Sequence, residues 1–266
     1  MSTLAEDVRE MVQEQREYRE LLVQMTKRDL LLRYKQTVMG FGWAVFMPLV
    51  NTAVFSVIFT RVAPMNVGMP YPLFAFCGLL AWNFFASSLR FSVSSLTGNT
   101  SLVTKIYFPR EIFPFSAILV CLVDFAVGSI VLIGLMVYYR VEVTPWVAAI
   151  PVVMAVQLAF TMGIGLLLAM ANLFFRDVKY LFEVVVTVWM FATSVLYPMQ
   201  AIGGRVARYA FLNPMTPIID SFRSVLLHGQ SPFTYEFAYA AVVSFLSLGV
   251  GWLLFHRTEF RFAENA

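Results

Sequence analysis

Long apolar segments alternate with short polar ones along most of this chain. A helix needs about 20 apolar residues to cross the hydrocarbon core of a membrane. Six segments approach or exceed that length, and they are 43–60, 71–89, 115–139, 146–175, 181–197 and 237–255. The pattern therefore predicts an all-α integral membrane protein, in which residues 37–266 form a domain of six transmembrane helices.

The fourth apolar segment is too long for a straight span, because its roughly thirty residues would make a helix of about 45 Å. Pro151 and Gly163 lie within it, so we expect a tilted or kinked helix that extends past the membrane. Ala155, Ala159 and Gly163 recur every four residues and leave one flank of the helix small. This spacing favours close packing against a neighbouring helix.

Residues 1–36 precede the first apolar segment and have a helical period of their own. Apolar side chains recur from Leu4 to Met25 at the spacing of one helix face, while charged side chains occupy the other faces. Thr3 with Glu6 fits a capping box at the start of this helix. We expect a cytoplasmic amphipathic helix on the membrane interface, either as a plain anchor or in partial contact with a basic partner surface.

The distribution of the 19 Lys and Arg residues predicts the orientation. Six spans put both termini on one side, and about fourteen of these cations then lie on that side against about five on the other. Cytoplasmic segments carry such an excess, so both termini are predicted to be cytoplasmic. We expect a multi-pass protein of the plasma membrane, which is the inner membrane if the cell has an outer one.

Composition supports the same class of protein. A hydrophobic content of 59% with 13% charged residues excludes an ordinary soluble domain. The basic residues are spread along the chain, so we expect no binding of nucleic acid.

The polar segment 99–114, NTSLVTKIYFPREIFP, separates the second and third apolar segments. Its cations place it on the cytoplasmic side. A plain connecting loop has no need of an apolar and stiff sequence beside two cations, so this segment is predicted to contact a partner protein. The candidate contact residues are Asn99, Leu102, Lys105, Ile106, Tyr107, Phe108, Pro109 and Arg110.

The external segment 198–236 is long for a connection between two spans, and it is also rather apolar. Asn213-Pro214 divides it, because proline disfavours helix in the residue before it. We expect a re-entrant pair of short external helices that line or close an exit before the last span. Asn213, Pro214 and Arg223 are the candidate gate residues.

No catalytic or metal-binding motif occurs in the sequence. The phosphate-binding pattern GxxxxGK followed by Ser or Thr is absent, as are GxSxG and HExxH. Cys77 and Cys121 fall inside apolar segments and are expected to be small buried side chains rather than metal ligands. We therefore expect no catalytic site, no metal and no cofactor in this chain, and energy for any transport must come from a partner.

Asp124 is the acid deepest within a predicted span. An ionisable residue inside a membrane is a functional candidate by default, and a structural hydrogen bond to a neighbouring helix explains it equally well. A membrane-embedded enzyme acting on lipids would draw on Asp124 and His228. These two residues are predicted at different depths or sides of the membrane, which argues against shared catalysis.

Five segments of the chain occur in a recognisable order. They are RDLLLRYKQTVMGFGWAVFMPL (28–49), YPLFAFCGLLAWNFF (71–85), NTSLVTKIYFPREIFP (99–114), NLFFRDVKYL (172–181) and LNPMTPIIDSFRSVLL (212–227). Together they resemble the membrane subunits of type-2 ABC exporters, in the branch that moves O-antigen, capsular polysaccharide and teichoic acid. One departure is SVLYP at 194–198, where many relatives carry a proline before Tyr-Pro, and it bears on how the local helix ends.

The resemblance implies a homodimer of this subunit joined to two copies of a separate ABC ATPase subunit, which would bind ATP and Mg²⁺. It implies that segment 99–114 is a coupling helix seated in a cleft of that ATPase. The region of Arg28-Asp29 and Arg33-Tyr34 would belong to the interfacial helix packed above it. The long external segment would correspond to a pair of gate helices.

Two stripes of aromatic and polar residues are candidates for a substrate path. Asn51, Phe55 and Phe59 share one face of the first span, and Trp189, Thr193 and Tyr197 share one face of the fifth. Aromatic faces suit sliding contact with sugar rings, although packing within the bundle or contact with lipid explains the same spacing. The resemblance favours the channel, because the first and fifth spans line it in that family.

The sequence thus predicts the permease subunit of an ATP-driven exporter. It would move a lipid-linked polysaccharide from the cytoplasm across the membrane, through a channel at the homodimer interface and in contact with membrane lipids. Teichoic acid, a drug, a lipid or a small metabolite are alternative cargoes. A polymer needs a continuous channel, whereas a small cargo needs a closed pocket.

Overall fold

A computed structural model describes residues 4–35, 37–40, 42–62, 64, 67–105, 108–199, 203–204, 209–259 and 262. Within these residues the chain forms helices and turns and no strand, which confirms the all-α prediction. The α-helices are α1 (Leu4–Glu17), α2 (Arg19–Tyr34), α3 (Gly42–Val57), α4 (Tyr71–Ser95), α5 (Thr100–Lys105), α6 (Ile112–Tyr138), α7 (Ile150–Phe174), α8 (Val178–Phe191), α10 (Met215–Leu226) and α11 (Tyr235–Thr258). Shorter helical turns are η1 (Ile58–Val62), η2 (Thr97–Asn99), η3 (Pro145–Ala149) and η5 (Ala210–Leu212).

Five helical segments of the described chain are long and apolar enough to cross a membrane. They are Gly42–Val62, Tyr71–Ser95, Ile112–Tyr138, Pro145–Phe174 and Tyr235–Thr258. They match the first four and the last of the six predicted segments. The first joins α3 to the π-helical turn η1, and the fourth joins η3 to α7.

The fifth predicted segment, 181–197, is not one continuous helix. α8 ends at Phe191, and its 14 residues measure about 21 Å, which is less than the hydrocarbon core of about 30 Å. In a continued helix the Ser194 carbonyl would need the N–H of residue 198, which is a proline and has none. The Arg223 guanidinium bonds to that carbonyl instead. The predicted helix end is therefore wrong, and the count of six spans stays a prediction.

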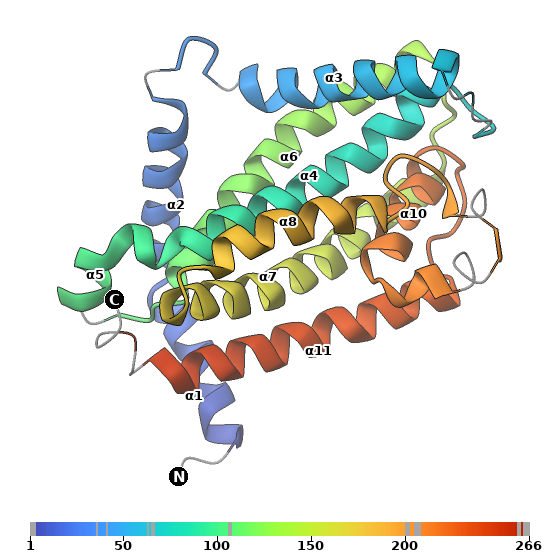
Figure 1. Ribbon diagram of the computed structural model, residues 1–266. Coiled ribbons are helices and arrows are strands. Elements are labelled where there is room, and N and C mark those ends of the chain that lie inside the picture. Colours follow the sequence, from blue (N-terminus) through green and yellow to red (C-terminus); the bar gives the residue numbers. More distant parts are fainter. Residues whose placement is uncertain are drawn as a thin grey trace.

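Figure 1 shows the long helices running back and forth between two ends of a bundle. α1, α5 and the last turn of α11 lie at one end, and α10 lies at the other. α4 is central, with α3, α6, α7, α8 and α10 packed around it. In the most apolar part of α4 83% of residues are buried, against 11% for Gly42–Val62, so α3 forms an edge of the bundle.

The N-terminal segment forms two helices instead of the single helix predicted. The break is at Tyr18, whose backbone leaves the helical region with φ −93° and ψ 15°. α2 packs along α6 while α1 meets α11, so the two halves bend toward different neighbours. Arg257 of α11 holds α1 through Asp7, with Nη2 2.6 Å from Oδ2. The predicted capping residue Thr3 lies outside the described residues.

α7 and α11 cross at glycines, as the small flank of α7 predicts. A Cβ atom on Gly163 would lie 2.4 Å from the backbone carbon of Ser247, and one on Gly251 would lie 2.5 Å from the Gly163 carbonyl oxygen. Ala159 is buried as well, whereas Ala155 is exposed. The close approach therefore belongs to the part of α7 around Gly163.

The segment after α8 breaks at Asn213 and Pro214, as predicted. η5 ends at Leu212, Asn213 is extended with φ −80° and ψ 107°, and α10 begins at Met215. The apolar side chains of α10 are buried against α4, α7 and α11. Much of the chain before η5 lies outside the described residues, so the re-entrant pair of helices stays a prediction.

Candidate functional site

The predicted coupling segment lies at the end of the bundle that also carries α1 and the last turn of α11 (Figure 1). η2 and α5 form its first part, and the chain then returns to α6 at Ile112, earlier than the predicted start at 115. Ile106 and Tyr107 lie outside the described residues, as does the side chain of Lys105.

Phe108 and Pro109 are buried within the chain itself. Phe108 is 8% exposed, and its ring centroid lies 5.4 Å from that of Phe113. Met25 of α2 belongs to the same apolar cluster, and Leu102 packs against it half-buried. The expectation that the Phe108 ring presses into a partner is therefore corrected, because the chain's own core covers this ring. Phe108 anchors the segment to the bundle.

Arg28, Asp29 and Asn99 come together, although the sequence separates α2 from η2 by two helices. Arg28 donates from Nη2 to Asp29 Oδ1 at 2.8 Å and to Asn99 Oδ1 at 3.0 Å. Asn99 in turn donates to the Ser95 carbonyl oxygen at 2.8 Å, and the Ser116 hydroxyl of α6 donates to Asp29 Oδ2 at 3.0 Å. These bonds join α2 to both sides of the predicted coupling segment, so a displacement of η2 is transmitted to α2 and α6.

Arg110 ties the other side of the segment to the chain after α11. Its guanidinium donates to the Glu259 carbonyl oxygen, and its backbone N–H donates to Glu259 Oε2 at 3.4 Å. Burial, and then the negative charge of Glu111, raise the pKa of Glu259 to about 7. Arg110 is thus engaged within the chain rather than free for a partner.

Glu111 is fully buried, and the sequence analysis did not single it out. Oε1 accepts hydrogen bonds from Trp252 Nε1 at 3.1 Å and from Gln15 Nε2 at 3.5 Å. Oε2 has no hydrogen-bond partner. The donors come from α11 and α1, which are 141 and 96 positions away along the chain, so no local pattern reveals this site.

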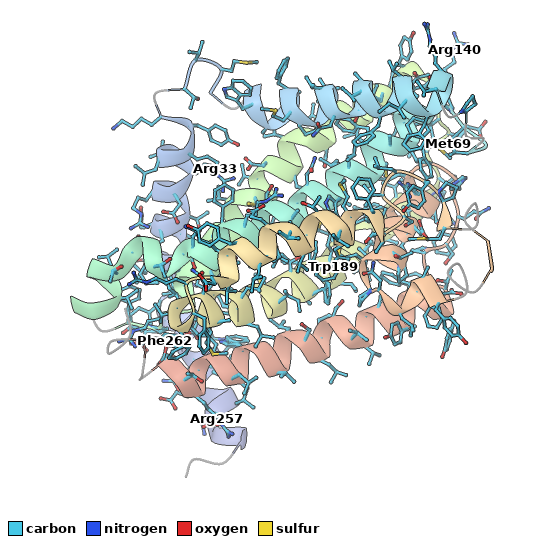
Figure 2. All side chains as sticks on the ribbon, viewed as in Figure 1. Arg33, Met69, Arg140, Trp189, Arg257 and Phe262 are labelled. Carbon is cyan, nitrogen blue, oxygen red and sulfur yellow. The ribbon has the colours of Figure 1, made fainter. Side chains whose placement is uncertain are left out.

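Asp124 forms an ion pair with Arg33 of α2. Arg33 Nη1 lies 2.5 Å from Asp124 Oδ2, and the Tyr34 hydroxyl donates to Oδ1 at 2.5 Å. The Arg33 guanidinium also lies 3.8 Å from the ring centroid of Phe91. Figure 2 shows Arg33 on α2, reaching toward the bundle. An acid inside a span needs such a partner, and this need is the signal that could have found Arg33.

A hollow of about 350 Å³ opens beside this ion pair, between α2, α3, α4 and α6. Arg33, Tyr34 and Asp124 line one part of it, and Trp43 and Asn51 of α3 line another. Of the predicted channel residues, Asn51 is thus the one that borders this hollow. Phe55 and Phe59 stack on each other with ring centroids 6.5 Å apart, and both are half-buried.

Trp189 lies on α8 and is half-buried (Figure 2). Its ring packs edge-on against Phe85 at 5.1 Å and Phe160 at 6.2 Å between centroids. Its Nε1 donates to Asn213 Oδ1 at 2.9 Å, and Asn213 Nδ2 donates to the Thr193 hydroxyl at 2.8 Å. The structure therefore joins predicted channel residues to a predicted gate residue, which the sequence did not suggest.

The predicted stripe of Trp189, Thr193 and Tyr197 does not lie on one helix face, and this expectation is corrected. α8 ends at Phe191, so Thr193 and Tyr197 follow in turns. The Thr193 hydroxyl bonds to the Trp189 carbonyl oxygen at 2.7 Å, and the Tyr197 hydroxyl bonds to that of Phe191. These groups stabilise the end of α8 by satisfying carbonyls that a helix terminus leaves open.

Arg223, a predicted gate residue, is buried at 3% exposure. Its guanidinium donates to the carbonyl oxygens of Ser194 and, at 2.6 Å, Val195, and it lies 3.6 Å from the ring centroid of Phe74. Asp220 Oδ1 is 3.4 Å away. Arg223 therefore locks α10 to the turn after α8 and to α4. Pro214 is also buried at the start of α10.

Comparison with known proteins places this arrangement in a family. The family model described as ABC-2 type transporter matches residues 20–227, which is most of the chain. The chain belongs to the ABC-2 type transporter membrane family. The family match confirms the expected membership, and with the five long apolar helices it identifies a multi-pass membrane protein.

Similar proteins span nearly the same length as this ABC-2 family chain. The O-antigen export system permease protein RfbA of Myxococcus xanthus is 32% identical over 96% of this chain and 98% of its own length. A protein of the same name from Klebsiella pneumoniae is 31% identical over 92% of this chain and 94% of its own length. The family match begins within α2 and ends before α11, so α1 and α11 lie outside it.

Proposed function

We propose that this chain is the permease subunit of an ATP-driven exporter that moves a lipid-linked polysaccharide of the O-antigen type out of the cytoplasm. The observation that carries the proposal is the similarity, over nearly the whole length of both chains, to proteins named as O-antigen export permeases. The five long apolar helices support a role within the membrane.

The energy comes from a separate ABC ATPase, of which two copies bind the exporter. The chain itself has no phosphate-binding loop for ATP and Mg²⁺. The coupling contact is made by segment 99–110 at the cytoplasmic end, where Arg28, Asp29 and Asn99 connect it to α2 and α6. Through these bonds, motion of the ATPase moves α2 and the spans behind it.

The exporter is a homodimer with a polysaccharide path between its two copies. In one protomer Asn51 of α3, Arg90 of α4 and Glu183 of α8 are all exposed. Arg90 Nε lies 2.9 Å from Glu183 Oε2. Exposing such polar groups to lipid is costly, most of all toward the middle of the membrane. This cost favours a second copy or a water-filled path on this side, with α8 and the turns after it as a sixth crossing.

Purification of the tagged chain in mild detergent from its own cells tests the proposal. We expect an ABC ATPase to co-purify, and vanadate to inhibit the ATP hydrolysis of the complex. Deletion of the gene should leave the completed polysaccharide inside the cell, detected with a surface-impermeant lectin before and after lysis. A chain that purifies without an ATPase, or cells that still display the polymer, would overturn the assignment.

The coupling contact needs its own test, because Phe108 is unsuitable for one. Phe108→Ala would open a cavity in the chain's own core and lower stability by about 3–5 kcal/mol. Tyr107→Ala is therefore the variant of choice, with Tyr235→Ala as its control, because Tyr235 is an exposed tyrosine at the start of α11. We expect Tyr107→Ala to reduce export and ATPase co-purification while the amount of permease in the membrane is unchanged. Full export by this variant would contradict the assigned contact.

A further inference from the structure

The buried acid Glu111 lies beside two other metal-ligating side chains that come from different helices. One ligand atom from each of Glu14, Glu111 and His256 lies within 4.8 Å of the other two. α1 supplies Glu14, the residue before α6 supplies Glu111, and α11 supplies His256. Glu111 is fully buried, and His256 is 6% exposed.

Each of these three side chains also carries a buried polar atom without a hydrogen-bond partner. The atoms are Glu14 Oε2, Glu111 Oε2 and His256 Nδ1. His256 Nδ1 is 3.9 Å from Glu14 Oε2, which is too far for a hydrogen bond. A buried polar group that is left unpaired costs about 1–3 kcal/mol, so three in one place require a common ligand.

The charged groups around the cluster favour a cation as that ligand. Glu10 Oε2 lies 4.0 Å from His256 Nε2, so a third carboxylate borders the histidine. The Arg110 guanidinium donates to the Glu259 carbonyl oxygen and its backbone N–H donates to Glu259 Oε2, so neither bonds to the cluster in these contacts.

We propose that Glu14, Glu111 and His256 form a binding site for one divalent transition-metal cation, for which Zn²⁺ is the natural probe. Imidazole nitrogen with carboxylate oxygens suits Zn²⁺, whereas Mg²⁺ and Ca²⁺ prefer oxygen alone. Zinc bonds of about 2.0–2.2 Å in a tetrahedron set ligand atoms about 3.4 Å apart. The three ligand atoms reach that spacing when rotations of their side chains displace them by about 1 Å.

The surroundings meet two further needs of a metal site. A metal on His256 Nδ1 leaves Nε2–H directed toward Glu10, and ligating histidines commonly donate their other N–H to a carboxylate. The side chain of Glu14 is 23% exposed and that of Glu10 is 62% exposed, so an ion has access from α1. The remaining coordination position is open to water.

The bound cation would fasten three parts of the cytoplasmic end to one another. It joins α1 and α11, which lie outside the matched family segment, to a residue within the predicted coupling segment 99–114. The inference concerns the purified chain and does not rest on export or on its cargo. Local sequence patterns do not predict this metal site, because its ligands are far apart along the chain.

Titration of the full-length, untagged chain in detergent with Co²⁺ and Zn²⁺ tests the site. After chelator treatment we expect one Co²⁺ per chain with visible d–d absorption, displaced by Zn²⁺. Zn²⁺ at about 100 times its Kd should raise the thermal midpoint by about 5 °C. It should also slow hydrogen exchange in residues 4–17, and Mg²⁺ should do neither.

Two variants and two matched controls assign the ligands. His256→Asn and Glu111→Gln should weaken Zn²⁺ binding at least about tenfold. His228→Asn replaces the other, exposed histidine, and Glu17→Gln replaces an exposed acid of α1, so both should bind as the parent chain does. Failure of the parent chain to bind Co²⁺ or Zn²⁺ would overturn the proposal, as would binding lost in His228→Asn but kept in His256→Asn. The Co²⁺ titration is made on the parent chain, so its result tests the proposal even if a variant misfolds.

Discussion

The two ends of the bundle each bury a charged side chain, and they compensate it differently. At the α10 end, Arg223 is surrounded by acceptors, namely the carbonyl oxygens of Ser194, Val195 and Phe74 together with Asp220. At the α1 end, Glu111 receives two donors on one oxygen and none on the other, and Glu14 beside it is also acidic. The Arg223 guanidinium at the α10 end thus has carbonyl and carboxylate acceptors, although its Nε has no partner, whereas the Glu111 carboxylate at the α1 end has only neutral donors.

This difference fits what each end has to do. Carbonyls that remain fixed to one arginine keep α4, α8 and α10 in one arrangement. A cluster completed by an external cation or partner has two states, one with and one without it. A buried carboxylate that has only neutral donors is therefore the better candidate for binding an external cation.

Replacement of Arg223 is the largest expected perturbation. Arg223→Met keeps most of the side-chain length but leaves the Ser194 and Val195 carbonyls without their donor, and Asp220 without its ion pair. The Asp220 side chain is 41% exposed, so the larger loss is that of the donor to two buried carbonyls, which costs about 1–3 kcal/mol for each. Thermal unfolding in detergent should show this loss, while Arg61→Met, at an exposed cation, should change little. Equal stability of the two variants would contradict the stabilising role of Arg223 at the α10 end.

Gly78 tests the same end from the side of α4. A Cβ atom at this position would lie 2.2 Å from Arg223 Nη2 and 2.5 Å from the Val195 carbonyl oxygen. Gly78→Ala should therefore destabilise by about 1–3 kcal/mol through overpacking. Gly134→Ala is the matched control on α6, because nothing lies within 4 Å of its Cβ, and it should stabilise by up to about 1 kcal/mol. If Gly78→Ala left the free energy of unfolding unchanged, Arg223 would have room to move away from the added methyl group.

Sequence alone predicts the parts of this molecule that local composition determines. Five of the six apolar segments are long helices, since length and apolarity act within each segment. The break at Asn213-Pro214 is also local, because proline constrains its own neighbour. These features required no knowledge of contacts.

The features that sequence missed depend on distant residues. α8 ends at Phe191, and in the turns that follow, the Ser194 carbonyl, which Pro198 cannot serve, is bonded by Arg223 from a distant part of the chain. Phe108 lies between the cations Lys105 and Arg110 in a polar segment and is nevertheless buried, because α2 and α6 cover it. Glu111 meets Trp252 and Gln15 only after α1 and α11 fold back to one end.

A milder change sharpens the comparison at the cytoplasmic end. Glu111→Gln keeps an acceptor for Trp252 but removes one negative charge beside Glu14. In chelator we expect this variant to be slightly more stable than the parent, because it lacks the negative charge that repels Glu14. With Zn²⁺ present the order should reverse, because the variant lacks a ligand. A destabilisation in chelator as large as that of Arg223→Met would mean that the negative charge of Glu111 is already balanced within the chain.

The smallest effect is expected between the two ends, at the exposed ion pair of Arg90 and Glu183. Its side chains are 43% and 54% exposed in the protomer, unlike Arg223 and Glu111. A double-mutant cycle with Arg90→Gln and Glu183→Gln isolates their coupling from the loss of either charge. For a pair in water we expect about 0.2–1 kcal/mol, reduced further by salt. A coupling energy well above about 1 kcal/mol, unaffected by salt, would mean that the pair is dehydrated in the assembled protein. The second copy would then cover this side of α4 and α8, and the water-filled path would have to lie elsewhere.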